Sequence, residues 1–512
     1  MVRRILAVIV LFVASVAAHE QAARPADAAG ATTSRFVPVA PTRLFDTRPA
    51  ARPLDDGIDG LVAPGGSVRL NVAARLGRSA AELTAVVLNV TITEATGPGY
   101  VQVVPGGATV GGSSNLNVES AGQTIANQVT VPVAADGSVT VFTQGGGHLV
   151  ADVFGWFTPA ADATAGRYEP LPAPSPRRIL DTRPAALVAP GGTVRVPIAA
   201  PGQVSAVVLG VTVTEATAPG FWQVVPTGGA TALGSSSNLN VTRAGQTIAN
   251  QVIVPVGADG SVTVFSQSGG HVVVDEAGVI TGAGAARSAA GLFVPITPDR
   301  LVDTRDPRNT PTVGPLRAGG DVTVSVAGRS GIASSAIAVA LNVTVTEAAG
   351  PGYVQVLPTG LAEPGATSNI NVERAGQTIA DAAWATVGSS SSFSLFTQRG
   401  GQLLADAAGW FTSGAVDVPL VTTPTVTPTV TPTSAPGTST TVPGTPAATT
   451  FAYVGTYDTS PGAGVTTFAV DAGTGALSRV GRTAATSPAF FAVHPSQHMV
   501  YAVNEIDGAG TV

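Results

Sequence analysis

The sequence predicts an all-β protein in which three β-sandwich-like modules follow one another before a linker and a further β-rich segment. The first observation is an internal repeat, because closely similar Arg-x-x-Asp-Thr-Arg words begin at Arg43, Arg178 and Arg300. A shared Ala-Gly-Gln-Thr-Ile-Ala word follows each of them, with its glycine at Gly122, Gly245 and Gly376. Consecutive copies are thus a domain length apart, well above the roughly 20–50 residues of a solenoid unit. The other observations are period-two apolar patterning and the lack of any helical periodicity of useful length.

The clearest strand of each copy is represented by residues 86–93. Val86, Leu88 and Val90 share one face, and Asn89 lies on the other. This alternation predicts a half-buried strand. Pro98 and Gly99 follow, and we expect them to turn the chain so that the next strand pairs with the first as a hairpin.

A weaker duplication lies inside each copy, because residues 129–143 repeat the strand, turn and strand plan of residues 87–104. With further strands around Leu44 and Val68, each copy contains about eight strands. Two sheets packed face to face would bury one apolar face of each, so we expect a sandwich.

The predicted modules span residues 35–160, 168–282 and 291–414. The joins between them are short and rich in small residues, so we expect limited bending between modules. Residues 415–450 repeat Val-Thr-Pro and Thr-Pro-Thr, a composition that favours an extended polyproline linker.

Residues 1–18 have the pattern of a secretory signal peptide. Arg3 and Arg4 precede an apolar stretch that is too short to span a bilayer, and small residues precede His19. We therefore expect a secreted protein, extracellular or associated with the cell wall, with no membrane span after signal cleavage. The chain has no cysteine, which excludes disulfides and thiolate metal sites.

Charge and motifs exclude several functions. Charged residues make up 11% of the 512 residues, the net charge is −6, and all 26 basic residues are Arg. No basic stripe is present, so nucleic acid is not an expected partner. We find no Gly-x-Ser-x-Gly word, no His-Glu-x-x-His word and no P-loop, and we expect no cofactor and no metal. The oligomeric state is left open.

Charged positions that recur in all three modules form the first candidate site. We expect them to act as an Arg–carboxylate brace that ties the first strand of each module to the last. The alternatives are a calcium site, which would use the same carboxylates, and a ligand site. Under the brace hypothesis, replacing Arg183 by Ala lowers the stability of its module. The brace positions are Asp46, Arg48, Asp152, Asp181, Arg183, Asp275, Asp303, Arg305 and Asp406.

Paired asparagines on one short strand form the second candidate site. Their amides are able either to bind a glycan, from the cell wall or another extracellular source, or to bond the neighbouring backbone, and we favour the structural role. The pairs are Asn115 with Asn117, Asn238 with Asn240, and Asn369 with Asn371.

Two exchanges between copies argue against further sites. His148 and His271 are replaced by Gln402 in the third copy, which argues against a metal ligand needed in every module. Trp156 and Trp410 correspond to Val279, which suits an apolar core position better than a sugar-stacking surface.

The end of the chain, from Phe451 onward, carries a different pattern. Strand-like segments include residues 489–494 and 499–505, which predict a hairpin. The words Tyr-Val-Gly-Thr-Tyr from Tyr453, His-Pro-Ser from His494 and Tyr-Ala-Val-Asn-Glu ending at Glu505 are present.

This segment, residues 451–512, resembles the start of the lactonase-type seven-bladed β-propeller family, which includes 6-phosphogluconolactonase-like proteins. The resemblance implies an incomplete propeller of a little over one blade. It nominates His494 and Glu505 for polar contact with a lactone or for general base catalysis, whereas the alternative is a turn at His494 and a structural role for Glu505. Residues 35–414 resemble the Asp-Thr-Arg repeat modules of secreted actinobacterial proteins.

Together these features predict a secreted or cell-surface protein whose three modules act as a stalk or binding array that displays a lactonase-like propeller. The alternative is an extracellular lactonase-type hydrolase with most of its catalytic domain beyond residue 512.

Overall fold

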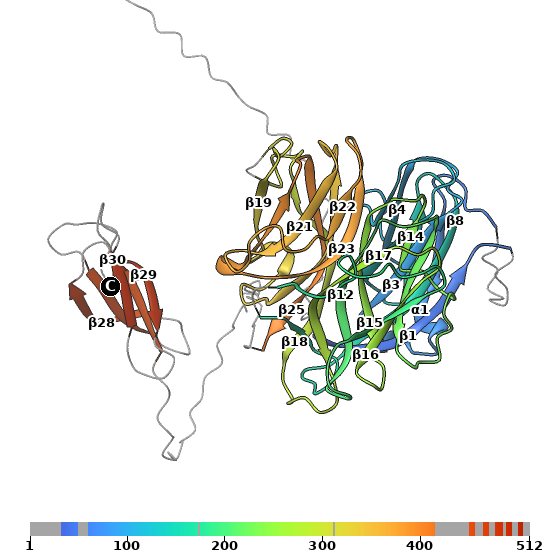
Figure 1. The fold of residues 1–512 in the computed structure, drawn as a ribbon. Coiled ribbons are helices and arrows are strands. Elements are labelled where there is room, and N and C mark those ends of the chain that lie inside the picture. Colours follow the sequence, from blue (N-terminus) through green and yellow to red (C-terminus); the bar gives the residue numbers. More distant parts are fainter. Residues whose placement is uncertain are drawn as a thin grey trace, which may run out of the picture. The chain divides into compact units, whose positions relative to one another are not determined.

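The computed structural model describes residues 32–49, 60–172, 175–310 and 313–414, together with five strands between residues 450 and 504. These residues form strands almost throughout, so the predicted all-β class is confirmed. Figure 1 shows the strands of residues 32–414 gathered in packed sheets. The longest helix in the described part of the chain is α1 (Val72–Arg75), far too short to cross a membrane.

The first module holds eight strands, α1 and the 3-10 turn η1 (Ala80–Glu82). Its strands are β1 (Ser34–Asp46), β2 (Ser67–Asn71), β3 (Ala85–Thr93), β4 (Gly99–Pro105), β5 (Leu116–Val118), β6 (Ile125–Pro132), β7 (Ser138–Thr143) and β8 (His148–Pro159).

The second module repeats this order, with its first strand divided in two. Its strands are β9 (Tyr168–Pro170), β10 (Arg177–Asp181), β11 (Thr193–Pro197), β12 (Val204–Thr214), β13 (Gly220–Pro226), β14 (Leu239–Val241), β15 (Ile248–Pro255), β16 (Ser261–Ser266) and β17 (His271–Thr281).

The third module repeats it again and adds the 3-10 turns η2 (Arg329–Gly331) and η3 (Ser389–Ser391). Its strands are β18 (Ala290–Asp303), β19 (Gly320–Ser325), β20 (Ala338–Thr346), β21 (Gly352–Pro358), β22 (Ile370–Val372), β23 (Ile379–Thr386), β24 (Ser392–Thr397) and β25 (Gln402–Ser413).

Each module is a jelly roll. In the first module the strand order is β1-β8-β3-β6 in one sheet, here called the inner sheet, and β2-β7-β4-β5 in the other, the outer sheet. The second and third modules have the same two orders, and the inner sheets of the first and third modules are joined through β1 and β18 into one eight-stranded sheet. Successive strands thus alternate between sheets, except that β4 and β5 pair directly, which is the double Greek-key arrangement of a jelly roll.

The predicted hairpin between residues 86–93 and their successor is wrong. β3 pairs with β6 and β8, whereas β4 pairs with β5 and β7 in the opposite sheet. Both edges of β3 are occupied by strands distant in sequence, so the chain after Pro98 crosses to the other sheet. The crossing lets both strands bury their apolar faces against each other across the sandwich.

The prediction that this strand is half-buried is also wrong, because all of β3 except Thr93 is buried. Val86 and Leu88 face the core of their own module. Ala85 and Val87, on the other face, join a second core that contains residues of all three modules. Period-two patterning detects the first face, but contact between modules buries the second.

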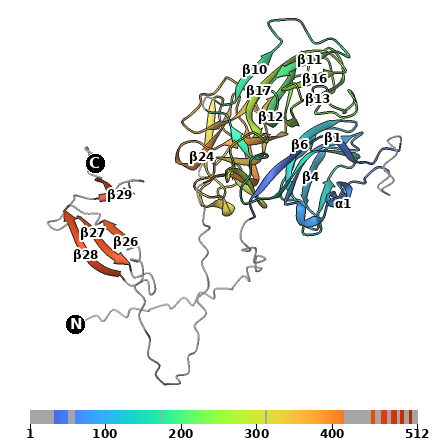
Figure 2. The ribbon, with the colours of Figure 1, turned by 90° about the horizontal axis from the view of Figure 1, so that it is seen from below.

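The second core makes the three modules one body, and the described residues from 32 to 414 belong to a single compact unit. Figure 2 shows the blue, green and orange modules around a common centre. The ring centroids of Phe157 and Phe293, from different modules, lie 4.2 Å apart. The three modules are thus packed together, whereas the sequence predicted limited bending at the joins between them. The aromatic members of this second core are Phe36, Phe154, Phe157, Tyr168, Trp222, Phe293, Trp384 and Phe411.

The second unit, residues 424–512, is described only through its strands. β26 (Thr450–Gly455), β27 (Gly464–Val470) and β28 (Leu477–Ala484) form an antiparallel sheet. β29 (Pro488–Val493) and β30 (Val500–Asn504) pair as the predicted hairpin, which is therefore confirmed.

Candidate functional site

The repeated Arg–carboxylate network lies where the first strand of each module meets the last. Arg43 on β1 donates from Nε to Asp152 Oδ1 on β8 at 2.6 Å, and from Nη1 to Asp46 Oδ2 at 2.5 Å. Arg178 bonds Asp275 at 2.9 Å in the second module. The bonds from Arg43 to Asp152 and from Arg178 to Asp275 cross between neighbouring strands of the inner sheet, and the third module has the same bond, from Arg300 to Asp406 at 2.7 Å.

The arginine that joins the strands differs from the predicted one. Arg48 donates from Nε and Nη2 to Asp46, two residues earlier, at 2.9 and 2.6 Å. Arg183 and Arg305 make the same local pair in their modules. The brace between strands is therefore made by the first arginine of each repeated word, which the prediction omitted.

The two carboxylates of each network have opposite pKa shifts. Burial raises the pKa of Asp152, although Arg43 partly offsets it, and the same holds for Asp275 and Asp406 with their arginines. Burial also acts on Asp46, but hydrogen bonds from Arg48 outweigh it and lower the pKa. The Arg183 side chain lowers the pKa of Asp181 to about 2.

These carboxylates bind guanidinium groups, an arrangement that favours the brace over the calcium alternative. In the parts of the chain that the structure describes, no group of three or more His, Asp or Glu side chains is placed to hold a metal ion.

The two asparagines of each predicted pair have different surroundings. Asn115 Oδ1 accepts a hydrogen bond from Val103 N at 2.7 Å, and Asn238 and Asn369 accept the equivalent bonds from Val224 N and Val356 N. This first asparagine therefore bonds the backbone of the neighbouring strand.

The second asparagine of the pair lies on the outer sheet. Asn117 lies directly opposite Tyr100 in the pairing of β4 with β5, and its amide contacts the hydroxyl of Ser114. Asn240 and Asn371 occupy the same place in the other modules.

The exchange of His for Gln has a structural explanation. Thr47 Oγ1 lies 3.0 Å from His148 Nδ1 and accepts a hydrogen bond from Leu149 N. In the third module Thr304 Oγ1 donates instead to Gln402 Oε1 at 2.6 Å. Either side chain provides a hydrogen-bond partner for the buried threonine hydroxyl, so both serve the same packing.

The predicted core role of the tryptophans agrees with their burial. Trp156 is 7% exposed and Trp410 is 4% exposed. Trp156 packs in the core of the first module and Trp410 in that of the third.

A ring of polar side chains, missed by the sequence reasoning, links the three modules. Asn250 Oδ1 accepts from Gln128 N at 3.3 Å, Asp381 Oδ1 accepts from Gln251 N at 3.1 Å, and Asn127 Oδ1 accepts from Ala382 N at 3.1 Å. Each bond joins one module to another, and the three close a circle. Asn127, Asn250 and Asp381 occupy equivalent positions of the repeat, but only contact between modules reveals the ring.

The arginines of the brace also reach the next module. Arg43 Nη2 donates to Ser235 O, Arg178 Nη2 to Ala366 O and Arg300 Nη2 to Gly112 O, at 3.2, 3.0 and 3.2 Å. The bonds run from the first module to the second, the second to the third and the third to the first.

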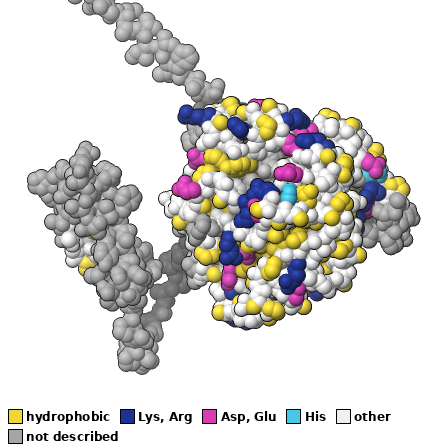
Figure 3. All heavy atoms as spheres, in the orientation of Figure 1, with side chains coloured by type: hydrophobic (Ala, Val, Ile, Leu, Met, Phe, Trp, Pro, Cys, Tyr) yellow, Lys and Arg dark blue, Asp and Glu magenta, His cyan; other side chains and the backbone are white. Residues whose placement is uncertain are grey.

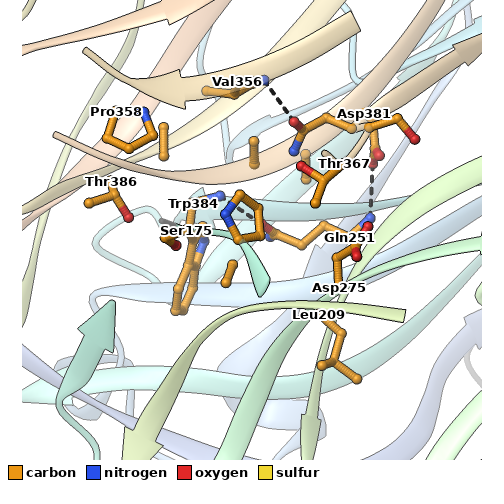
Figure 4. A pocket seen from close by; sticks show the side chains of 18 residues that line it. Ser175, Leu209, Gln251, Asp275, Val356, Pro358, Thr367, Asp381, Trp384 and Thr386 are labelled. Atoms are coloured by element: carbon orange, nitrogen blue, oxygen red, sulfur yellow. Dashed lines mark hydrogen bonds between the residues drawn. The ribbon is translucent and has the colours of Figure 1, made fainter. Parts of the chain in front are cut away.

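A small cavity of about 40 Å³ lies between the second and third modules. Figure 4 shows Gln251, Asp275 and Asp381 around it. Asp381 is buried, and burial raises its pKa well above the usual value. Gln251 Nε2 is buried without a hydrogen-bond partner.

One lining position of this cavity is a glycine in the second module, although a cavity of about 30 Å³ also lies at the equivalent interface of the third and first modules, where the side chain of Asn342 is present. Asn89 Nδ2 donates to Ser237 O of the second module at 2.7 Å, and Asn342 Nδ2 donates to Ser114 O at 2.6 Å. The equivalent residue of the second module is Gly210. A Cβ at Gly210 would have its nearest neighbours at 3.9 Å, so the site has room for a side chain.

Replacing Gly210 by Asn is expected to stabilise the protein by about 1 kcal/mol, because the new amide fills space and donates to the interface. The measurement is urea unfolding followed by tryptophan fluorescence. The matched control is Asn342→Gly, which we expect to destabilise by a similar amount. A Gly210→Asn variant less stable than the parent would contradict this account.

The two residues nominated by the propeller resemblance, His494 and Glu505, lie outside the described residues. The pairing of β29 with β30 places the strands that immediately precede each of them side by side.

Residues 451–512 match the family model of the lactonase 7-bladed β-propeller. The matched segment holds nearly all of β26 and all of β27 to β30, and the match agrees with the resemblance drawn from the sequence words. No curated protein matches the chain.

Among solved structures, the chain is similar to a protein described under "The Triple Jelly Roll Fold and Turret Assembly in an Archaeal Virus". The identity is 10%, the coverage is 74% of this chain and 91% of that chain, and the TM-score is 0.15. The strand order of each module by itself defines the jelly roll.

Proposed function

We propose that the chain is exported and that its three modules form one base that holds the lactonase-like segment outside the cell. The observation that carries this proposal is the core shared by all three modules, which belong to a unit separate from residues 424–512. The signal-like pattern of residues 1–18 supports export. The Thr/Pro-rich composition between the units favours an extended spacer.

A closed ring of modules is better suited to attach the protein to a surface than to act as a long stalk. A linear stalk would place three modules end to end, whereas here each module contacts both others through the polar ring. Three equivalent outer surfaces on one body favour multivalent attachment, in which weak contacts act together.

The test is a specific protease site inserted within residues 424–449 of the full chain, expressed in a cell that secretes it. When intact cells are treated with this protease, we expect residues 1–423 to remain in the cell-wall fraction and the lactonase-like segment to enter the medium. The control is the same protein without the inserted site. Retention of the lactonase-like segment, or release of the modules, would contradict the proposal.

A second candidate function, lactone hydrolysis, is favoured by the family match of residues 451–512. On this proposal His494 and Glu505 contact the lactone or act as a general base. The cleaved and uncleaved proteins of the same experiment are assayed on 6-phosphogluconolactone, with His494→Ala and Glu505→Gln as variants. If both variants hydrolyse the lactone as fast as the parent, neither residue takes part in the reaction.

A further inference from the structure

An aromatic ring flanked by two carboxamides lies on the outer sheet of the first module. Tyr100 on β4 is directly opposite Asn117 on β5. On its other side lies Gln144, which follows β7 and donates its backbone N–H to Tyr100 O at 2.9 Å. We call this set of three side chains the amide–aromatic row.

The row recurs in every module as an aromatic ring between an asparagine and a glutamine. The second module has Phe221 between its amides and the third has Tyr353, so the ring is retained where the hydroxyl is not. The complete rows are Asn117, Tyr100 and Gln144; Asn240, Phe221 and Gln267; and Asn371, Tyr353 and Gln398.

A second ring extends each row along the sheet. The centroid of Phe142 lies 5.8 Å from that of Tyr100. The pairs Phe221 with Phe265 and Tyr353 with Phe396 are separated by 6.1 and 5.9 Å. Two neighbouring rings form a longer apolar strip than one ring.

The rows face away from the module core. Val101 and Val103 alternate with Tyr100 along β4 and are buried in the core. Because side chains alternate between faces of a strand, Tyr100 is on the outer face. Tyr100 and Asn117 are partly exposed and Gln144 is exposed, and the other modules show the same pattern.

The chemistry of the row indicates its ligand. An aromatic face carries partial negative charge and attracts the C–H groups on the apolar face of a pyranose ring. A carboxamide both donates and accepts hydrogen bonds, as sugar hydroxyls require. None of the nine side chains is charged, so the rows do not suit phosphate or an acidic peptide.

We propose that each amide–aromatic row binds a neutral saccharide, with the ring stacked on a pyranose and the two amides bonding its hydroxyls. The inference deepens the proposed function by naming the partner of the base, and it rests on that function for its extracellular setting. Sites on three modules of one body give three-point attachment to a polysaccharide.

The spread of charged side chains over the surface agrees with a neutral ligand. On the face shown in Figure 3, basic and acidic side chains are interspersed among apolar and neutral ones. Arg69, on the outer-sheet strand β2, is paired with Asp136 at 2.6 Å. A neutral polar ligand therefore meets no unpaired charge from this arginine.

The test uses the full chain and four probes: cellohexaose, chitohexaose, mannohexaose and maltohexaose. Binding is measured by saturation-transfer NMR and titration. We expect at least one hexasaccharide to bind, and affinity to fall at least tenfold in the ring variant Tyr100→Leu, Phe221→Leu, Tyr353→Leu. Leucine keeps bulk on the sheet but removes the aromatic face.

Two further variants complete the design. The amide variant Asn117→Ala, Asn240→Ala, Asn371→Ala tests the row without changing a ring, and we expect a similar loss of affinity. The control is Leu61→Ala with Leu187→Ala, at side chains that are 51% and 46% exposed, and we expect unchanged affinity. Thermal melting checks that each variant is folded.

The proposal is overturned if none of the four hexasaccharides binds, or if binding is equal in the parent and in the folded ring or amide variant. A surface that captures a wall protein but no hexasaccharide also overturns it. The cleavage experiment on intact cells is scored by location rather than by sugar binding, so failure of one proposal is distinguishable from failure of the other.

Discussion

Replacing Asp381 by Asn is expected to stabilise the three-module unit by about 2 kcal/mol at pH 7, the scale of one unsatisfied buried polar group. Asp381 is the acidic member of a ring whose other members are Asn127 and Asn250. Both asparagines donate from Nδ2 to a backbone carbonyl, Asn115 O and Asn238 O, at 2.7 Å. At pH 7 the carboxyl group of Asp381 must either ionise, which removes both the donor and its hydration, or keep a proton that the unfolded chain has lost, and either course lowers stability relative to an asparagine amide.

The gain should depend on pH in a defined direction. Burial raises the pKa of Asp381 well above its ordinary value, and hydrogen bonds from the backbone of Gln251 and Ala382 only partly offset this. As the pH rises above about 4, the unfolded chain loses this proton before the folded chain does. The contribution of Asp381 to the free energy of unfolding is thus fully present at low pH. It is lost as the pH rises toward the pKa that Asp381 has in the folded chain. The same cavity is lined by Asp275, which is paired with Arg178.

The measurement is urea unfolding of parent and Asp381→Asn between pH 4 and pH 7. The stability difference should be small at pH 4 and grow toward pH 7. Asn250→Asp is the matched control, because it places an acid at the equivalent ring position and should destabilise with the same pH sense. An Asp381→Asn variant that is less stable at pH 7 would refute this account of the ring.

Replacing Arg300 by Ala is expected to destabilise the protein by about 3 kcal/mol, because it leaves Asp406 buried without its cation. The Arg300 side chain is 20% exposed and that of Asp406 is 10% exposed. Arg300 also bonds Asp303 and reaches Gly112 O in the first module. Loss of the guanidinium thus weakens both the third module and its contact with the first.

The matched control is Arg305→Ala. Arg305 also pairs with Asp303, but its side chain is 45% exposed, so we expect a loss below about 1 kcal/mol. The Arg183 side chain is exposed to a similar degree. Its replacement should therefore also lower the free energy of unfolding only slightly, whereas the sequence predicted a loss of module stability. Equal losses in the Arg300 and Arg305 variants, measured by urea unfolding, would show that the brace is not specific to the strand-joining arginine.

The candidate sites illustrate how far residue patterns reach. Because they recur in all three copies, Asp152 and its equivalents were recognised as candidate brace residues. The Arg-x-x-Asp-Thr-Arg word was recognised for the same reason. Repetition did not distinguish Arg43 from Arg48, because both recur in every copy. The distinction depends on the register of β1 with β8, where Arg43 lies opposite Asp152. Register is a property of two strands that are far apart in the sequence, so neither local sequence contains it.

The sequence by itself determined the all-β class, the threefold repeat and the strand hairpin of the last segment, because these depend on local periodicity and composition. Only the tertiary structure decided that β3 and β4 lie in different sheets and that three modules share one core. Alternation states which residues share a face of a strand, but not which surface covers that face. Asn127, Asn250 and Asp381 therefore read as unrelated positions until packing between modules brings them into one ring.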